Sequence, residues 1–469
     1  MTFLVISSCT KLEDLNKDVK RPTAVPGVTL FSNAQVNIAN QIASTNVNMN
    51  VFKLWAQYWT ETTYTDESNY DIINRTIADN AWREWYRDVL MDLKEAGIII
   101  KATTYATDAE TKASLNQLVI IDIMEVFVYE RMVTLWGNIP YTEALDIDNI
   151  LPKYDDALTI YKDLLGRLDT DIAGLDVSQA SFGGADLVYG GDVAAWKMFA
   201  NSLKLKMGIV LSDVDAALAT TTVNGAIAGA FTSNADNASF AFLSSTPNTN
   251  PLYVDLTLSG RQDFVGTETI LDGQMNLLDD SRRAAYFTFA PDTNVYLGGV
   301  PGQSSPYAAF SHPGDVMTQD PTFPCLLLSY VEVEFYLAEA AARGFTNDTP
   351  EEHYNAGITA SFNYWGSPDV DTYLANPDVA YATATGTWEE KIATQSWLAY
   401  YNNGYLGWTV YRRLGFPTMP VAADATIASI PSRFTYPVFE QTLNPASYNE
   451  AASAVGGDLL TTKLWFDKH

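Results

Sequence analysis

Apolar residues recur at helical spacing over most of the chain. In residues 155–175 they fall at four-residue steps from Ile160 to Ile172, the pattern of a helix with one buried face. Residues 109–135 are apolar on nearly every side, which predicts a helix buried among neighbours and ended by Gly137. The same criteria predict helices within 30–60, after a cap at Asp79 or Asn80, and at 191–211, 328–343, 350–365, 387–401 and 404–414.

The helical pattern fades between residues 231 and 325. This segment is rich in Ser, Thr, Asn, Gly and Pro, which predicts irregular structure with long loops of the kind that carry binding sites. Paired helices on either side, with small residues at 338–342 that allow close approach, predict a mostly α repeat scaffold. We expect a leader and tether at 1–26, then one domain over 27–469: a helical scaffold (27–230 and 326–415), a loop-rich lobe (231–325) and a C-terminal coil (416–469).

Acidic residues outnumber basic ones, 56 against 28, and the formal net charge is −28. Such a charge argues against binding to nucleic acid or adsorption to an anionic membrane, because both are polyanions. The chain has no apolar run of about 18 residues, so no membrane-spanning helix is predicted. Three histidines and two cysteines leave little material for a zinc site or for histidine catalysis. Cys325 is predicted to be a buried, inert thiol.

The first nine residues, MTFLVISSC, have the pattern of the end of a secretory signal. An apolar stretch, Phe3 to Ile6, is followed by two small serines and then by Cys9. This ending resembles a bacterial lipobox, although the charged beginning and the longer apolar region of a signal are missing. The alternative is an incidental cysteine near a frayed end. We expect Cys9 to carry a lipid and the polar segment after it to act as a tether.

Aromatic side chains on loops are the best candidates for ligand contacts, because rings cover apolar ligand faces while nearby polar groups form hydrogen bonds. The first candidate cluster comprises Trp59, Tyr64, Asp66, Asn69 and Tyr70, followed in sequence by Trp82 and Arg83. Trp82 either contacts the ligand or belongs, like Trp85, to the apolar face of its helix. The second cluster lies in the lobe and comprises Tyr253, Arg261, Phe264, Tyr296 and Tyr307. Arg261 either binds the ligand or forms a loop salt bridge.

Carboxylates are plentiful, but their spacing does not indicate catalysis. Asp155–Asp156 and Asp279–Asp280 are adjacent pairs, which diverge on a helix and cannot flank one glycosidic bond. The loop at 66–71 is rich in Asp but lacks the spaced ligands of a calcium loop. No phosphate-binding glycine loop, nucleophile elbow or HExxH motif is present. We therefore predict a binding protein that is not an enzyme and needs no cofactor or metal. The alternatives are a surface glycan hydrolase and a structural surface protein that holds another protein.

Several stretches, spread in order along the chain, resemble the SusD/RagB family and specifically its SusD-like branch. In the first half they are WREWYRDVLMDL (82–93), YERMVTLWGNIPYTEAL (129–145), LPKYDDALTIYKDLL (151–165) and YGGDVAAWKMFANSLKLKM (189–207). In the second half they include LLLSYVEVEFYLAEAAARGF (326–345), WTVYRRLGFP (408–417), IPSRFTYPVFEQTLNPASYNEA (430–451) and KLWFDK (463–468). A resemblance over nearly the whole chain is more specific than any single motif.

The resemblance implies a fold, a location and partners. The fold would be an α/α superhelix of tetratricopeptide-like helix pairs with an irregular, loop-rich lobe. The protein would be a lipoprotein on the surface side of the outer membrane, held through its lipid anchor alone. It would capture an oligosaccharide or a peptide and deliver it to a SusC-like TonB-dependent transporter. In the family, the loop after the first helices borders the ligand site, which agrees with the candidate cluster around Tyr64.

Overall fold

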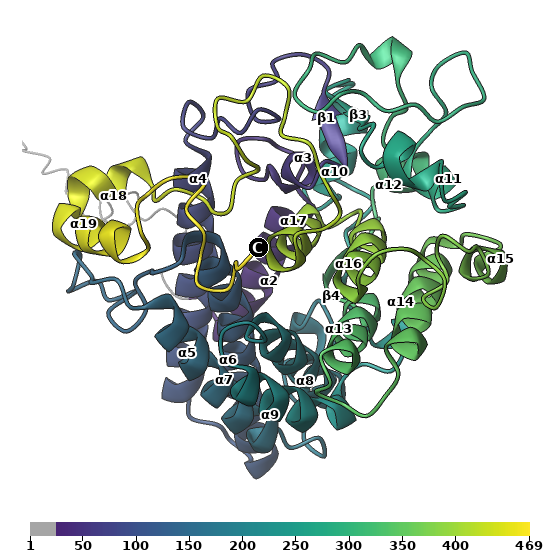
Figure 1. The fold of residues 1–469 in the computed structure, drawn as a ribbon. Coiled ribbons are helices and arrows are strands. Elements are labelled where there is room, and N and C mark those ends of the chain that lie inside the picture. Colours follow the sequence, from purple (N-terminus) through teal and green to yellow (C-terminus); the bar gives the residue numbers. More distant parts are fainter. Residues whose placement is uncertain (1–24) are drawn as a thin grey trace, which may run out of the picture.

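Paired helices form the body of the protein, and a loop-rich lobe lies above them in Figure 1. The structure is a computed structural model that describes residues 25–469, so Cys9 and most of the expected leader and tether lie outside the described residues. The longer helices are α2 (Gly27–Ala43), α5 (Met91–Ala102), α6 (Asp108–Trp136), α7 (Ala157–Gly174), α8 (Val193–Val210), α9 (Ala216–Ala226), α13 (Tyr330–Ala342), α14 (Pro350–Trp365), α16 (Trp388–Ala399) and α17 (Gly404–Leu414).

Neighbours in sequence pack as antiparallel pairs: α6 with α7, α8 with α9, α13 with α14, and α16 with α17. Contacts between α7 and α8 and between α8 and α13 join these pairs, which follow one another around the lower part of Figure 1. The arrangement confirms the predicted mostly α superhelix. No helix within residues 25–469 is long and apolar enough to cross a membrane.

Helix α6 shows how the sequence builds this scaffold. A capping box between Thr107 and Glu110 satisfies its first backbone N–H groups. Every residue from Val126 to Trp136 is buried, whereas residues 108–112 and Leu115 are exposed, so the burial predicted for 109–135 is confirmed only for the later part of the helix. Gly137 ends the helix with φ +86°, a conformation that favours glycine. Because the later part of the helix is buried on all sides, its polar side chains need partners, and Glu130 pairs with Lys206 of α8 at 2.8 Å.

The lobe consists of short elements, as predicted for residues 231–325. Two small antiparallel sheets attach it to the scaffold: β1 (Trp59–Glu61) pairs with β3 (Phe264–Gly266), and β2 (Ala238–Phe240) pairs with β4 (Cys325–Leu328). Short helices occur in the lobe and elsewhere along the chain. The α-helices among them are α3 (Phe52–Trp55), α4 (Ile77–Arg83), α10 (Pro251–Tyr253), α11 (Arg283–Tyr286), α12 (Asp315–Thr318) and α15 (Val370–Leu374). The π-helices are η1 (Glu84–Leu90), η5 (Val254–Leu258) and η6 (Leu271–Met275), and the 3-10 helices are η2 (Gly183–Ala185), η3 (Ile227–Gly229), η4 (Asn234–Asp236) and η7 (Tyr307–Ala309).

The segment from α3 to β1 is fixed against α16 and α17. Trp397 Nε1 donates to the Ala56 carbonyl at 2.9 Å, and the Tyr58 hydroxyl donates to the Trp397 carbonyl. Trp59 Nε1 donates to the Tyr401 hydroxyl at 2.8 Å. At Gly404 the first turn of α17 approaches the α3 backbone so closely that a Cβ would overlap it. This contact places β1, and through β1 the loop that follows it, relative to the lobe.

Two local expectations need correction, and a third is confirmed. The C-terminal segment, expected as coil, contains α18 (Val438–Leu443), which follows Pro437, and α19 (Pro445–Ala454), whose first residue is a proline that fits a helix start. Asp79 does not cap a helix, because α4 begins two residues earlier; its carboxylate instead accepts hydrogen bonds from the Val438 and Phe439 backbone. Cys325 is a buried free thiol, as predicted, and burial raises its pKa to about 12.

The close crossing at Gly404 provides a test of the fold. We expect Gly404→Ala to lower the free energy of unfolding by about 1–3 kcal/mol, because the new Cβ overlaps backbone atoms of Phe52 and Lys53 that cannot rotate away. Gly166→Ala in α7 is the control: a Cβ there meets nothing within 4 Å, so the higher helix propensity of alanine should stabilise the protein by up to about 1 kcal/mol. Urea denaturation measures both, and equal effects would contradict the tight crossing.

Candidate functional site

A polar hollow of about 360 Å³ lies where the scaffold meets the lobe. The scaffold contributes residues 45–48 after α2 together with the loop that follows β1, and the lobe contributes residues 255–264. We call this hollow the groove and define it by Asn46, Asn48, Glu61, Tyr64, Arg75, Asp255, Arg261 and Asp263. A smaller hollow of about 80 Å³ adjoins it, sharing Arg261, Asp263 and Phe264 and ending at Tyr307 and His312. The groove thus joins Tyr64 of the first predicted cluster with Arg261 and Phe264 of the second.

Tyr64 is the prominent aromatic side chain of the groove. It is 81% exposed, and its backbone has φ +56°, which turns the loop at this point. The loop is held from behind: Asn69 Nδ2 donates to the Thr65 and Gly302 carbonyls at 2.8 Å each, and the Tyr70 hydroxyl accepts from the Ala422 N–H at 3.0 Å. An exposed ring on a fixed loop is suited to stacking on a ligand.

The other predicted residues occupy three kinds of position. Trp59, Tyr70 and Trp82 are no more than 5% exposed and lie in the core, where Trp82 packs edge-on against Trp136. Asn69 supports the Tyr64 loop. Asp66 and Arg83 are exposed but do not line the groove.

Tyr296 lies in a different hollow, of about 790 Å³. Its ring centroid is 4.5 Å from that of Phe289, and the Arg283 guanidinium lies 5.6 Å from its centroid. The structure therefore brings together only part of the predicted set, because burial takes the large rings out of the groove and Tyr296 faces another hollow.

Most polar residues of the groove were not among those predicted from the sequence. Asn46, Asn48, Asp255 and Asp263 come from segments far apart in sequence, and none forms a recognisable motif. Thr45 Oγ1 donates to Asp255 at 3.1 Å, which links the loop after α2 to the lobe. Tyr307 stacks on His312 with centroids 3.4 Å apart, and burial lowers the pKa of His312, so this ring is neutral at pH 7. The predicted turn-rich composition of the lobe was the available signal for a site here.

Glu61 and Glu67 form a buried carboxyl pair at the base of the Tyr64 loop. Burial, together with the charge of the adjacent Glu67, raises the pKa of Glu61 to about 8. The Ser68 N–H donates to Glu61 at 2.9 Å, and Arg75 contacts Glu67. The two carboxyl groups adjoin one another, so no glycosidic bond fits between them, and their arrangement differs from that of a glycosidase. The raised pKa favours the protonated form of Glu61, so the buried pair avoids carrying two negative charges at neutral pH.

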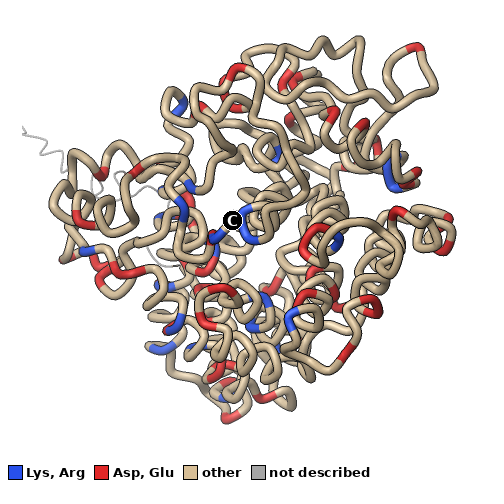
Figure 2. Tube along the Cα trace, in the orientation of Figure 1, with Lys and Arg blue, Asp and Glu red and all other residues tan. Residues whose placement is uncertain are grey.

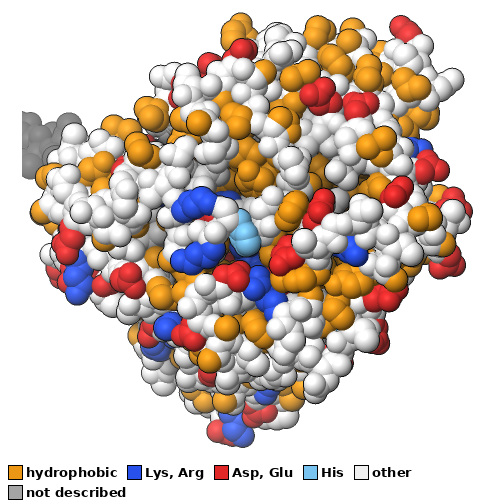
Figure 3. Space-filling model, viewed as in Figure 1, with side chains coloured by type: hydrophobic (Ala, Val, Ile, Leu, Met, Phe, Trp, Pro, Cys, Tyr) orange, Lys and Arg blue, Asp and Glu red, His pale blue; other side chains and the backbone are white. Residues whose placement is uncertain are grey.

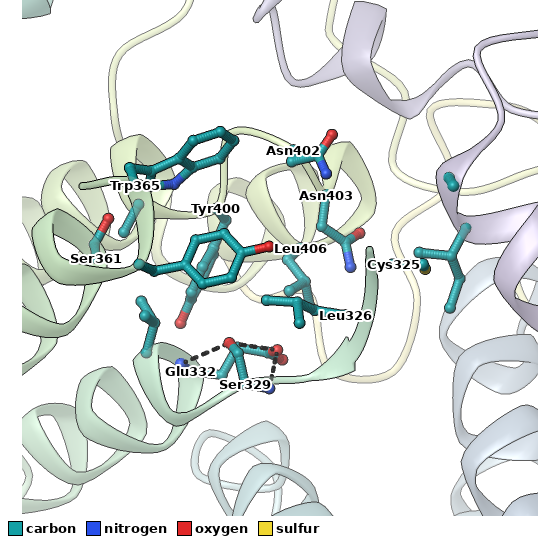
Figure 4. Close-up of a pocket in the computed structure, with 15 residues that line it drawn as sticks. Cys325, Leu326, Ser329, Glu332, Ser361, Trp365, Tyr400, Asn402, Asn403 and Leu406 are labelled. Atoms are coloured by element: carbon teal, nitrogen blue, oxygen red, sulfur yellow. Dashed lines mark hydrogen bonds between the residues drawn. The ribbon is translucent and has the colours of Figure 1, made fainter. Parts of the chain in front are cut away.

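A second enclosed space lies inside the scaffold between α13, α14, α16 and α17 (Figure 4). Its volume is about 60 Å³, well below the roughly 300 Å³ or more of ordinary ligand pockets. Glu332, which lines it, bonds back to Ser329 as part of a helix capping box (Figure 4). Within residues 25–469, no group of three or more His, Cys, Asp or Glu side chains is placed to hold a metal ion. The groove is therefore the better candidate site.

The carboxyl pair generates a prediction for pH dependence. The folded-state pKa of Glu61, about 8, lies above its ordinary value of 4.5, so the stability it contributes is complete below pH 4.5 and is lost as pH rises towards 8. Glu61→Gln keeps the acceptor for Ser68 and donates permanently to Glu67. We expect this variant to be more stable than wild type at pH 8.5 by about 1–3 kcal/mol and to lose less stability between pH 5 and pH 8.5. Thermal unfolding of both proteins at both pH values measures the difference in stability. An equal loss of stability in the variant and the wild type would contradict the raised pKa of Glu61.

Comparisons with known proteins agree with this architecture. The family model described as "Starch-binding associating with outer membrane", SusD-like, matches residues 19–437. No curated protein sequence matches the chain. A solved structure described as a chitin-binding protein is 25% identical, with a TM-score of 0.80 over 94% of this chain and 100% of the other. A SusD homologue from Bacteroides uniformis is 26% identical, with a TM-score of 0.79 over 94% and 99% of the two chains.

A chitin-binding SusD homologue from Flavobacterium johnsoniae, 23% identical, has the same fold, with a TM-score of 0.79 over 93% of this chain and 98% of the other. The family match covers most of the chain, and the structural matches cover almost all of the described residues. The protein therefore belongs to the SusD-like family of starch-binding proteins that associate with the outer membrane.

Proposed function

We propose that the protein captures an oligosaccharide in the groove and delivers it to a SusC-like TonB-dependent transporter in the outer membrane. The observation that carries the proposal is the exposed Tyr64 ring beside a polar hollow of about 360 Å³, on a loop fixed to the scaffold. Family membership supports glycan binding at the outer membrane. The chitin-binding neighbours, which share the fold, point to the same class of ligand.

The groove has the two components that sugar binding requires. The Tyr64 ring covers the C–H face of a sugar, and the amides and charged groups around it form hydrogen bonds with hydroxyls. Arg261 is exposed and lies 3.7 Å from Asp263, so the two present donors and acceptors side by side. Affinity then comes from one stacked ring and a few hydrogen bonds, which suits a protein that must release its ligand. A peptide is the second ligand class, and it belongs in the same binding assay.

The proposal includes binding without catalysis. Glu61 lines the groove from the scaffold, whereas Asp255 and Asp263 line it from the lobe. Glu61 adjoins Glu67 at the base of the Tyr64 loop and accepts a hydrogen bond from the Ser68 N–H, so we assign it a structural role there. Inverting and retaining glycosidases place two carboxyl groups on opposite sides of the bond they break. We expect bound oligosaccharides to be recovered at their original length after prolonged incubation. Chromatography that detects shortened products would favour the hydrolase alternative.

Loss of the exposed ring tests the ligand site. We expect Tyr64→Ala to weaken oligosaccharide binding about tenfold without changing the melting temperature, because a stacked aromatic contact contributes about 1–2 kcal/mol and the ring packs against little else. Tyr105→Ala is the matched control, since Tyr105 is a half-exposed tyrosine in the loop between α5 and α6. Calorimetry against a panel of neutral oligosaccharides measures both variants. Unchanged affinity in Tyr64→Ala would move the site elsewhere, and Tyr296→Ala would then test the separate hollow.

Variants of the two cysteines test whether Cys9 carries the lipid anchor. We expect Cys9→Ala to shift the protein from the membrane fraction to the soluble fraction when it is expressed in its native host, because the lipid would be attached there. Cys325→Ala is the control, because the Cys325 thiol is buried and cannot carry a lipid. Fractionation followed by immunoblotting measures the distribution. Membrane retention of the Cys9→Ala protein would contradict lipid attachment at this residue.

A separate experiment addresses the partner: co-purification of the protein with an outer-membrane barrel would identify the transporter.

A further inference from the structure

Carboxylates outnumber basic groups across the groove and the smaller hollow beside it. Asp255 and Asp263 line the groove, and Asp315 lines the smaller hollow. Glu61 also lines the groove, but its raised pKa of about 8 keeps it mostly protonated at pH 7. Their basic counterparts in the lining are Arg75 and Arg261. A charged ligand would therefore meet an acidic surface at close range, where charges interact strongly because little water separates them.

Both arginines already face carboxylates of this chain. Arg75 contacts Glu67, which is completely buried, so its charge is needed to neutralise that carboxylate. Arg261 Nε lies 3.7 Å from Asp263 Oδ2, and its field also reaches Asp255. An acidic sugar would have to compete with these internal partners for either arginine. Burial raises the pKa of Asp255, whereas its hydrogen bond from the Thr45 hydroxyl, a neutral donor, favours the charged form.

The surroundings have the same sign. The chain carries a formal charge of −28, and acidic residues are distributed over both the scaffold and the lobe in Figure 2. On the face drawn in Figure 3, Lys and Arg side chains gather near the C-terminus, whereas the upper part, over the β1–β3 region, shows acidic side chains. An anionic ligand is thus repelled during approach as well as in the groove, and at physiological salt this field extends over about 8 Å.

We propose that the groove selects uncharged and amine-bearing glycans and discriminates against acidic ones such as uronic-acid oligomers. The inference rests on the proposed function and specifies the substrate class for the same site. Uncharged sugars bind through Tyr64 and through hydrogen bonds to the aspartates, which accept from hydroxyls. A protonated amine gains in addition a charge-assisted hydrogen bond to Asp255 or Asp263. A carboxylate in the same position faces like charge and loses affinity.

Preferred binding of acidic glycans would require Arg261 to leave Asp263. The Arg261 side chain is 62% exposed, so it can rotate away from this partner. A guanidinium that left its internal partner would form a bidentate pair with a sugar carboxylate. Acidic glycans would then bind most tightly, and the preference would disappear in Arg261→Ala. The two possibilities predict opposite orders of affinity.

The experiment compares ligands that differ in charge. Calorimetry on the folded protein would use neutral malto- and chito-oligosaccharides, fully deacetylated chito-oligosaccharides and oligogalacturonates, all of similar length. We expect the oligogalacturonates to bind at least tenfold more weakly than the best neutral ligand, and the deacetylated chito-oligosaccharides to bind at least as tightly as their acetylated forms. Raising the salt from about 50 to 300 mM should narrow these differences. Equal or tighter binding of oligogalacturonates would overturn the selectivity while leaving glycan capture in place. No binding by any glycan would overturn the proposed function itself.

A charge-neutralising variant locates the effect. We expect Asp263→Asn to tighten oligogalacturonate binding about fivefold relative to the neutral ligands, and to weaken binding of the deacetylated ligand by a similar factor relative to them. Glu352→Gln, in the exposed first turn of α14, removes the same charge away from the groove and should change none of the affinities. Equal shifts in both variants would show that the net charge of the molecule acts alone and would overturn a selective groove. Melting temperatures of both variants confirm that each is folded.

Discussion

The segment from α3 to β1 is held against α16 and α17, and the geometry of the candidate site depends on this contact. Gly404 lets two backbones meet, while Tyr58, Trp59 and Trp397 join the segment to the helices through side-chain hydrogen bonds. Because β1 leaves the scaffold at a fixed point, it pairs with β3 in one register and draws the lobe onto the helices. The groove forms along that junction, so its two walls are positioned by the scaffold rather than by the loops themselves.

Large aromatic residues in this region serve mainly to build the support for the site. Trp55 packs against Trp408 and Phe434, and Trp59 packs against Phe264, so their rings stabilise the junction from inside. Tyr64 lies on the other side of the same chain segment and is exposed. A rigid base with one exposed ring loses little conformational entropy on binding, which favours useful affinity from few contacts. The loop after β1 thus combines a structural role with a role in recognition.

Polar groups beneath the loop make this support sensitive to charge. Glu67 is buried and contacts Arg75, and the adjacent Glu61 has a raised pKa that favours its protonated form. The pair removes most of the charge that two buried carboxylates would carry, which limits the desolvation cost. The half-buried aspartates of the lobe, Asp255 and Asp263, give the groove its acidic character. Carboxyl side chains therefore have two roles here: Glu61 and Glu67 support the loop from below, and Asp255 and Asp263 influence which class of ligand binds above it.

The sequence alone was sufficient to predict most of the long helices, the loop-rich lobe and the family, because amphipathic spacing and glycine stops are local signals that neighbours in sequence encode together. Helix α14 begins at Pro350 and α17 ends at Leu414, where the pattern predicted. Only the tertiary structure decided which aromatics are exposed. In the sequence, Tyr64 does not differ from Trp59, Tyr70 and Trp82, which are also aromatic and lie near loops or helix ends. Packing against the α16–α17 region and the C-terminal segment buries those three side chains. The groove itself was not predictable, since Asn46, Glu61 and Asp263 meet only after β1 pairs with β3, and that pairing depends on long-range contacts.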